Sequence, residues 1–185
     1  MQRLFIGLEL PRIILQQLLA LREEIPGARW QSAQQLHLTL CFIGNADAEL
    51  TEQINSYMNA LETAAFSLSL QGLGYFGPVH KPRALWLGAK PAASLIGLQK
   101  EVEHRLSALG LAPDTRPYQP HVTLARFSRN SPELSPGTVK SFLARHEDYR
   151  SPVFEVACAS LFRSNPGPAG SLYEVIERFD LSPAT

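Results

Sequence analysis

Cysteine and long apolar runs are both scarce in this chain of 185 residues. The two cysteines, Cys41 and Cys158, lie far apart and form no CxxC pair, which argues against a zinc knuckle and against a disulfide framework. Both fall in apolar, strand-like runs, so we expect them to be buried small hydrophobic residues. No stretch approaches the roughly 20 apolar residues of a membrane span, and the start MQRLFIGLELP lacks the basic region and long apolar core of a secretion signal. These absences predict a cytoplasmic protein with no membrane partner.

Net charge is also absent. Lysine and arginine together number 17, as do aspartate and glutamate, so the formal net charge at pH 7 is +0. A uniformly basic surface for a long phosphate backbone is therefore not indicated, and any nucleic-acid substrate would be held locally. Most of the basic residues are arginines, whose forked guanidinium suits phosphate oxygens, and Arg116, Arg126 and Arg129 lie close together in the sequence. With 45% hydrophobic residues the chain can bury a core, which predicts a compact globular protein.

Two nearly identical tetrapeptides, HLTL at residues 37–40 and HVTL at residues 121–124, stand out in a chain with only five histidines. In a β-strand successive side chains alternate between the two faces, so His37 and Thr39 would project from one face while the leucines pack on the other. His121 and Thr123 would be arranged in the same way. Each tetrapeptide would thus aim an imidazole and a hydroxyl in one direction, and the two copies suggest a single shared site.

The hydrophobic periodicity predicts the same order of elements in both halves of the chain: strand, helix, motif strand, helix, strand. In the first half the expected elements are a strand at 3–10, a helix at 11–24, a strand at 36–44, a helix at 47–62 capped by Asp47 and a strand at 66–76. In the second half they are a strand at 84–89, a helix at 92–109, a strand at 121–127, a helix at 139–146 and strands at 153–163 and 172–180. This order indicates a duplicated topology.

The chain resembles the RNA 2′,3′-cyclic phosphodiesterases of the 2H phosphoesterase superfamily, which are also called 2′-5′ RNA ligases. The resemblance rests on the two H-x-T-x motifs and on an ordered set of blocks: RLFIGLELP, LHLTLCFIG, ALWLG, RPYQPHVTLAR and GSLYEVIERFDL. It implies an α+β fold that spans residues 1–185 as one bilobal domain, acting as a monomer. Two antiparallel sheets related by a pseudo-two-fold axis would carry helices on their outer faces and one motif each toward a central cleft.

The resemblance also implies an activity, the hydrolysis of a 2′,3′-cyclic phosphate at an RNA or oligonucleotide end, with no cofactor. Opening such a ring requires that water lose a proton and that a ribose oxygen gain one, and an imidazole with an unperturbed pKa of about 6.5 can do either. By this carry-over His37 is the acid that protonates the leaving 3′-oxygen and His121 is the base that activates water. Thr39 and Thr123 would donate hydrogen bonds to the phosphate oxygens. The expected product is a 2′-phosphate.

Two further residues are implied as substrate-binding. Arg126 matches a family arginine near the phosphate, and Phe42 matches an aromatic residue that can contact the nucleoside. Strict alternation along a strand would put both side chains on the face opposite the histidines. Both assignments therefore require that each motif strand end, bulge or twist after its threonine.

The remaining histidines and the tryptophans do not belong to a repeated motif like H-x-T-x. His80 lies in a Gly/Pro turn, and His104 and His146 lie in charged runs, so we expect all three to be exposed. Trp86 is expected to pack in the core or at an edge. The role of Tyr118, in the loop before the second motif, is left open.

Other functions compete with this one. A noncatalytic module could recognise RNA ends or nucleotides in the same cleft, although a binder would not need a matched acid and base. Ligation of RNA halves through a 2′-5′ bond is the same chemistry in reverse. A metal site is disfavoured, because threonine is a weak ligand and no acidic residue adjoins either motif histidine.

Overall fold

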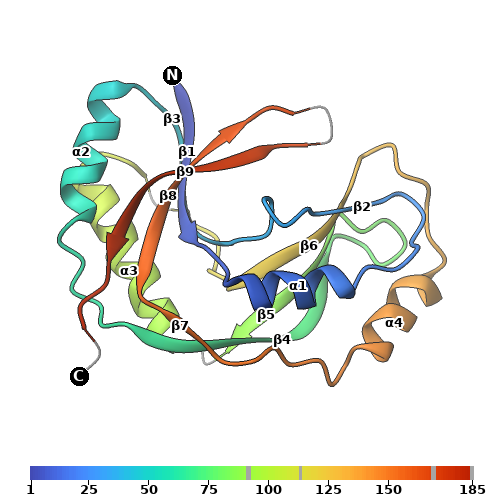
Figure 1. Cartoon of the computed structure of the whole chain (residues 1–185). Coiled ribbons are helices and arrows are strands. Elements are labelled where there is room, and N and C mark those ends of the chain that lie inside the picture. The colour runs from blue at the N-terminus through green and yellow to red at the C-terminus, as the bar shows by residue number, and fades with distance from the viewer. Residues whose placement is uncertain (91–92, 113, 168–169, 184–185) are drawn as a thin grey trace.

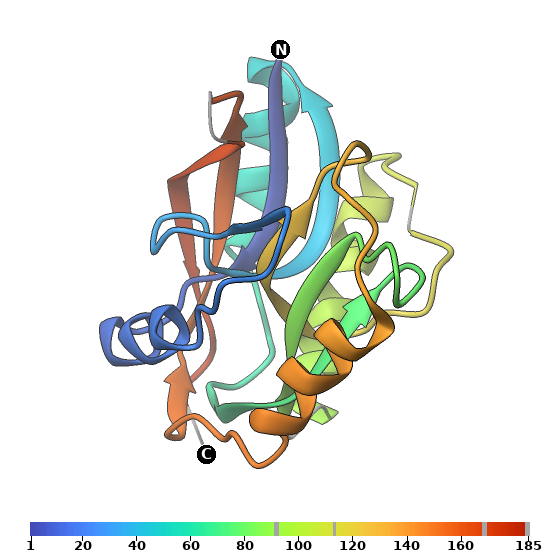
Figure 2. The same ribbon diagram turned by 90° about the vertical axis from the view of Figure 1, so that its right-hand side faces the viewer.

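The computed structural model describes residues 1–90, 93–112, 114–167 and 170–183. Within them the chain forms nine strands and four helices (Figures 1 and 2). The strands are β1 (Gln2–Leu8), β2 (Ala28–Trp30), β3 (Leu38–Ala46), β4 (Phe66–Phe76), β5 (Ala84–Lys90), β6 (His121–Phe127), β7 (Phe154–Val156), β8 (Cys158–Asn165) and β9 (Leu172–Asp180). The helices are α1 (Arg12–Ala20), α2 (Ala48–Met58), α3 (Ala93–Ala108) and α4 (Pro136–Arg145).

The strands form a single curled sheet in which every ladder between named strands is antiparallel, and the α+β class is confirmed (Figures 1 and 2). Its order is β7-β4-β5-β6-β3-β1-β8-β9, with β2 paired to β6. This differs from the expected two separate sheets, because the two motif strands pair through Leu38 and Val122. Both residues are fully buried, so the two halves meet where their motifs pack into the core. The pseudo-two-fold axis stays a prediction.

Several elements lie where the sequence predicts them. The strands at 66–76, 121–127 and 172–180 have the predicted bounds. Asp47 caps α2 as expected, because its carboxylate accepts a hydrogen bond of 2.9 Å from the Leu50 N–H. The long helix of the second half is confirmed as α3, although Ala92, where we predicted its start, lies outside the described residues.

Other element bounds differ from the prediction. The stretch 153–163 is two strands, because the chain leaves β4 after β7 and joins β1 as β8 at the other end of the sheet. The helix predicted for 11–24 ends at Ala20, and α4 begins at Pro136 rather than at residue 139. The short strand β2 was not predicted. Its three residues are ordered as a strand by their pairing with β6, which periodicity cannot reveal.

The helices pack around two hydrophobic clusters. In the larger one, α2 and α3 lie against β3, and α1 contributes Ile14 and Leu18 to the same core. In the smaller one, Val139 and Phe142 of α4 pack over Leu85 of β5 and residues of β6. No helix within the described residues is both long and apolar enough to cross a membrane.

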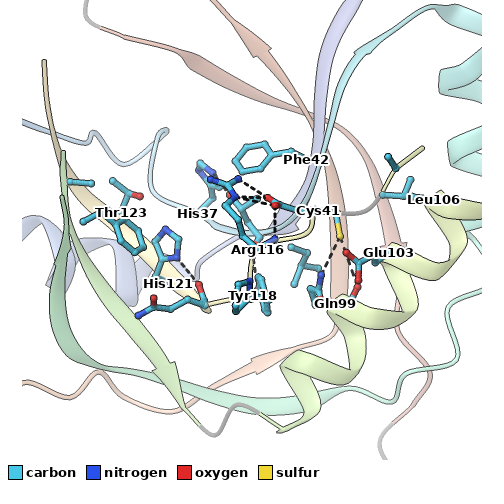
Figure 3. A pocket seen from close by; sticks show the side chains of 18 of the residues that line it. His37, Cys41, Phe42, Gln99, Glu103, Leu106, Arg116, Tyr118, His121 and Thr123 are labelled. Atoms are coloured by element: carbon cyan, nitrogen blue, oxygen red, sulfur yellow. Dashed lines mark hydrogen bonds and ion pairs between the residues drawn. The ribbon is translucent and has the colours of Figure 1, made fainter. Parts of the chain in front are cut away.

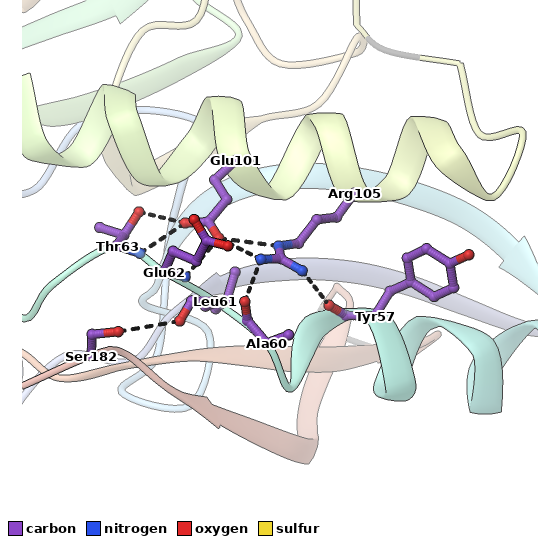
Figure 4. Close-up of polar contacts among 8 residues, drawn as sticks. All are labelled: Tyr57, Ala60, Leu61, Glu62, Thr63, Glu101, Arg105 and Ser182. Carbon is purple, nitrogen blue, oxygen red and sulfur yellow. Dashed lines mark hydrogen bonds and ion pairs between the residues drawn. The ribbon is translucent and has the colours of Figure 1, made fainter.

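The helix α3 is held to the connection between α2 and β4 by a polar cluster (Figure 4). The Glu101 carboxylate accepts hydrogen bonds from the Thr63 hydroxyl at 2.6 Å and from the backbone N–H of Glu62 at 2.7 Å. Arg105 donates to that carboxylate at 2.9 Å and to the carbonyls of Tyr57 and Ala60. These bonds fix the position of α3, whose opposite side lines the pocket described below.

Candidate active site

A β-bulge follows the threonine in the first motif strand. The ladder between β1 and β3 pairs Gly7 with Thr39 and then Ile6 with Cys41, which leaves Leu40 without a partner of its own. A bulge of one residue inverts the alternation of side chains beyond it. The strand therefore changes face after its motif.

The second motif strand carries a bulge at the same motif position. The ladder between β5 and β6 shifts register between Leu85 and Trp86, which leaves Leu124 unpaired. Because both strands change face here, Phe42 and Arg126 project on the same side as the motif histidines. Both residues line the pocket that contains those histidines, so the bulge that their assignment required is present in each strand.

The two imidazoles are oriented in the same way. The Nδ1 atom of His37 lies 2.7 Å from the Gln35 carbonyl oxygen, and Nδ1 of His121 lies 2.7 Å from the Gln119 carbonyl oxygen. Because a carbonyl only accepts hydrogen bonds, each Nδ1 carries the hydrogen. In the neutral ring each Nε2 is then a free base. For His37 this Nε2 lies 3.1 Å from the hydroxyl oxygen of Thr39.

A pocket of about 590 Å³ contains both motifs (Figure 3). It brings together all six residues that the sequence singles out: His37, Thr39, Phe42, His121, Thr123 and Arg126. Arg116 also lines it, whereas the exposed Arg129 lies outside its lining. A volume of this size suits a small ligand such as a nucleotide.

Aromatic rings surround His37. Its ring centroid lies 4.8 Å from that of Phe5, 4.7 Å from Tyr173 and 5.6 Å from Phe162. The last two residues belong to β9 and β8, which are distant in sequence from the motif. The C-terminal hairpin therefore covers this histidine with apolar surface.

His121 has fewer aromatic neighbours. Its ring centroid lies 5.0 Å from Phe76 and 6.0 Å from Trp86. Trp86 in turn lies across Gly74, where a Cβ atom would come within 2.2 Å of the indole ring. Only glycine at that position leaves room for the tryptophan to pack behind the second motif.

The protein environment lowers the pKa of both histidines. Burial is the main cause for His37, whose pKa falls to about 4. The positive charge of Arg126 lowers it further, as does that of His121 when His121 is protonated. Burial also lowers the pKa of His121, again with a contribution from Arg126. In the free protein both imidazoles are therefore neutral at pH 7. The hydrogen bonds to the two backbone carbonyls act in the opposite direction.

The pocket includes residues that sequence reasoning missed. Tyr118, whose role was left open, donates a hydrogen bond of 3.0 Å to the Thr39 carbonyl and so ties the loop before one motif to the other motif. Gln99 and Glu103 reach the pocket from α3, and Arg83 reaches it from the turn before β5. Nothing in their local sequence distinguishes them from ordinary surface residues.

The other titratable residues agree only in part with the predictions. Cys41 is half-buried in the pocket wall, and burial raises the pKa of its thiol to about 12. Cys158 is also half-buried. His80 and His104 are exposed as predicted. The prediction for His146 was wrong: it is half-buried, and its Nε2 lies 2.7 Å from the Glu23 carboxylate, because α4 packs against the connection between α1 and β2.

No group of three or more His, Cys, Asp or Glu side chains that could hold a metal ion occurs in the part of the chain that the structure describes.

Comparison with known sequences identifies a matching family model and several related proteins. A sequence model of the 2′-5′ RNA ligase superfamily matches residues 14–164. The RNA 2′,3′-cyclic phosphodiesterase of Geobacillus stearothermophilus is 33% identical over 159 residues, which cover 85% of this chain and 49% of that protein. The enzyme of the same name from Methanocaldococcus jannaschii is 28% identical over 181 residues, 96% of this chain and 99% of that one. The chain thus spans about half of the first relative and nearly all of the second.

Comparison with solved structures extends the similarity to the whole fold. A crystal structure of a Thermus thermophilus protein matches with a TM-score of 0.78 and 25% identity, covering 99% of this chain and 100% of that one. Escherichia coli LigT in complex with 3′-AMP matches with a TM-score of 0.75 and 25% identity, covering 97% of this chain and 98% of LigT.

Proposed function

This chain belongs to the 2′-5′ RNA ligase superfamily, and we propose that it hydrolyses 2′,3′-cyclic phosphate ends of RNA to 2′-phosphomonoesters. The observation that carries the proposal is the convergence of two imidazoles, each with its Nδ1 bound to a carbonyl, in one pocket with two threonines and an arginine. The names of the relatives, RNA 2′,3′-cyclic phosphodiesterases, support the substrate class. In this proposal residues 1–185 act as one bilobal catalytic domain.

His121 acts as the base in this mechanism. Its imidazole is neutral at pH 7, so Nε2 can accept a proton from a water molecule as that water attacks phosphorus. The hydrogen bond from Nδ1 to the Gln119 carbonyl keeps the ring in the required tautomer and stabilises the imidazolium that forms. The more open setting of His121, with two aromatic neighbours, leaves access for the water.

His37 acts as the acid. As the bond between phosphorus and the 3′-oxygen breaks, the Nε2–H of His37 donates its proton to that oxygen, which leaves the phosphate on the 2′-oxygen. The low pKa of free His37 must rise before it can carry this proton. The negative charge of a cyclic phosphate supplies that rise, because an anion nearby favours the charged imidazolium. Substrate binding thus favours protonation of His37, the form that can act as the acid.

The other site residues bind the phosphate and the nucleoside. The Thr39 and Thr123 hydroxyls donate hydrogen bonds to the non-bridging oxygens, and Arg126 supplies positive charge where negative charge develops in the transition state. Phe42 is 64% exposed beside them and offers a flat apolar surface to the base. The same residues would serve the reverse reaction, 2′-5′ ligation, by microscopic reversibility.

The test is incubation of the protein with a short oligonucleotide that ends in a 2′,3′-cyclic phosphate, with the products separated by chromatography. We expect a 2′-phosphate that resists a phosphatase specific for 3′ ends, and we expect activity to persist with a chelator. In the free protein the pKa of His37 is lowered to about 4, so its imidazole is neutral and ready to accept a proton. This property taken alone favours the opposite assignment, with His37 as the base and His121 as the acid. The product isomer decides between the two assignments. A 3′-phosphate would mean that the histidines exchange roles. Tight binding without any product would leave a noncatalytic RNA-end module.

A further inference from the structure

A second pocket, of about 340 Å³, adjoins the first. The two pockets share His37, Phe42 and Arg126, so these residues form the wall between them. The second pocket extends away from His121, which does not line it, toward the start of β1 and the β8–β9 hairpin. A ligand that fills the first pocket at the histidines can therefore continue past Phe42 into the second.

Three arginines meet at the second pocket. Arg3 comes from β1, Arg29 from β2 and Arg126 from β6, and all three are exposed. None of the ion pairs found among the described residues involves them. The described residues that line the pocket include no aspartate or glutamate. Three like charges around one hollow without a carboxylate make it a site for an anion.

The three arginines of the second pocket lie in strands rather than in loops, so the sheet sets their positions. Arg29 lies directly opposite Arg126 in the ladder between β2 and β6, so the two guanidinium groups start from the same face. Arg3 lies opposite Ser164, which in turn lies opposite Tyr173 in the next ladder. One row of cross-strand neighbours thus brings a cation, a hydroxyl and an aromatic ring to one side of the pocket.

The edge of the pocket is also anchored by hydrogen bonds. The buried Gln35 donates from Nε2 to the Ser171 carbonyl at 2.9 Å and accepts at Oε1 from the Ser32 N–H at 3.0 Å. These bonds join the segment before the first motif to the C-terminal hairpin. The pocket is therefore built from segments at both ends of the chain, and hydrogen bonds within the protein hold these segments together.

We propose that this second pocket binds the phosphodiester group on the 5′ side of the terminal nucleotide, an inference that rests on the proposed function. The shared wall orients such a substrate: the cyclic phosphate lies between the histidines, the preceding phosphate contacts Arg3 and Arg29, and Phe42 supports a base between them. The protein is then selective for RNA ends over free cyclic mononucleotides. The uneven use of arginine in a chain of zero net charge fits this local capture.

The experiment measures the binding of two probes, a dinucleotide that ends in a 2′-phosphate and the matching mononucleotide 2′-phosphate. Arg3→Gln and Arg29→Gln should each weaken the dinucleotide about tenfold more than the mononucleotide. The salt dependence of wild-type binding should be steeper for the dinucleotide, by about 0.7 in log K against log salt for one extra phosphate. In the double variant this difference should disappear. Thermal melts establish that the variants fold.

The matched control is Arg12→Gln, because Arg12 is exposed at the start of α1 and lines neither pocket. Its affinities for both probes should equal those of the wild type. No loss in Arg3→Gln and Arg29→Gln, or equal losses for both probes, would overturn the second subsite. Turnover of the corresponding cyclic substrates is measured in parallel. If the wild type hydrolyses neither, the proposed function fails, while the binding data still decide whether the subsite exists.

Discussion

The two halves of the pocket start from the same four-residue pattern and differ in what surrounds it. Each motif histidine donates from Nδ1 to a carbonyl two residues upstream, at 2.7 Å in both cases. Each motif strand bulges after its threonine. Beyond this, His37 is packed among Phe5, Phe162 and Tyr173, whereas His121 contacts Phe76 and Trp86.

This difference shows that residues outside the motifs set the chemistry of each histidine. The pKa of His37 falls to about 4 mainly because of burial, and the C-terminal hairpin supplies much of the covering surface. The pKa of His121 is also lowered by burial, in a more open part of the pocket. Two identical functional groups thus differ before any substrate binds. An anion bound between them would oppose the effect of burial on both pKa values.

The strongest test of the comparison is removal of each imidazole in turn. We expect His37→Ala and His121→Ala each to lower turnover of the cyclic substrate by about 10² to 10⁴, the loss typical of one acid or base. His104→Ala is the matched control, because that histidine is exposed and lies outside the pocket. Single-turnover rates on folded variants give the measurement. Near wild-type activity in either motif variant would remove that histidine from the mechanism.

A second test concerns stability at acid pH. His37 has a folded-state pKa of about 4, below the unfolded value of about 6.5, so the unfolded chain binds the extra proton first. The free energy of unfolding is therefore larger at pH 7, where His37 is neutral in both states, than at acid pH, where the unfolded chain is protonated at His37. The loss, on the order of 3 kcal/mol, develops as pH falls from about 6.5 to about 4.

Urea unfolding at pH 7 and pH 4.5 measures this loss. The free energy of unfolding should fall more between these pH values in the wild type than in His37→Gln, which has no imidazole to protonate. For His121→Gln the difference from the wild type should be smaller, because the pKa of His121 is lowered less. Parallel losses in the wild type and His37→Gln would show that the aromatic surroundings do not hold His37 neutral.

The smallest expected effect separates the two threonines. Thr39→Ala and Thr123→Ala should each weaken transition-state stabilisation by about 1.5 to 3 kcal/mol through loss of hydrogen bonds to a charged phosphate. Thr39→Ala should in addition shift the pH profile of turnover, because in the described part of the chain only the Thr39 hydroxyl lies within hydrogen-bond distance of its motif histidine, at 3.1 Å. Rates across pH 5 to 8 provide the comparison. Identical profiles for both variants would contradict this asymmetry.

Much of the fold could be predicted from local pattern. The strands β4, β6 and β9 have the predicted bounds because alternation of apolar and polar residues reports which face is buried. Asp47 could be recognised as a helix cap because its carboxylate acts on its own neighbours. Strand β2 and the division of residues 153–163 could not, because pairing partners far away in sequence decide them.

The four motif residues could be named in advance because the tetrapeptide repeats, whereas Arg126 and Phe42 were implied only by the family resemblance. Strict strand alternation argued against both, and the bulges that bring them to the pocket are seen only in the structure. The other pocket residues could not be named. Tyr118 became a site residue through one long-range hydrogen bond to Thr39. His146, in a charged run that indicated exposure, is half-buried because of its contact with Glu23 from another part of the chain.

The sequence by itself therefore determined the paired H-x-T-x motifs and most of the helices and strands, because these rest on residue type and short-range spacing, and its ordered blocks indicated the superfamily. Only the tertiary structure decided that the two halves share one sheet, through the pairing of Leu38 with Val122. It also decided that the C-terminal hairpin packs aromatic rings against His37 and that Arg3 and Arg29 meet beside the same pocket. Burial and the convergence of charge depend on contacts between distant segments, and no local pattern carries that information.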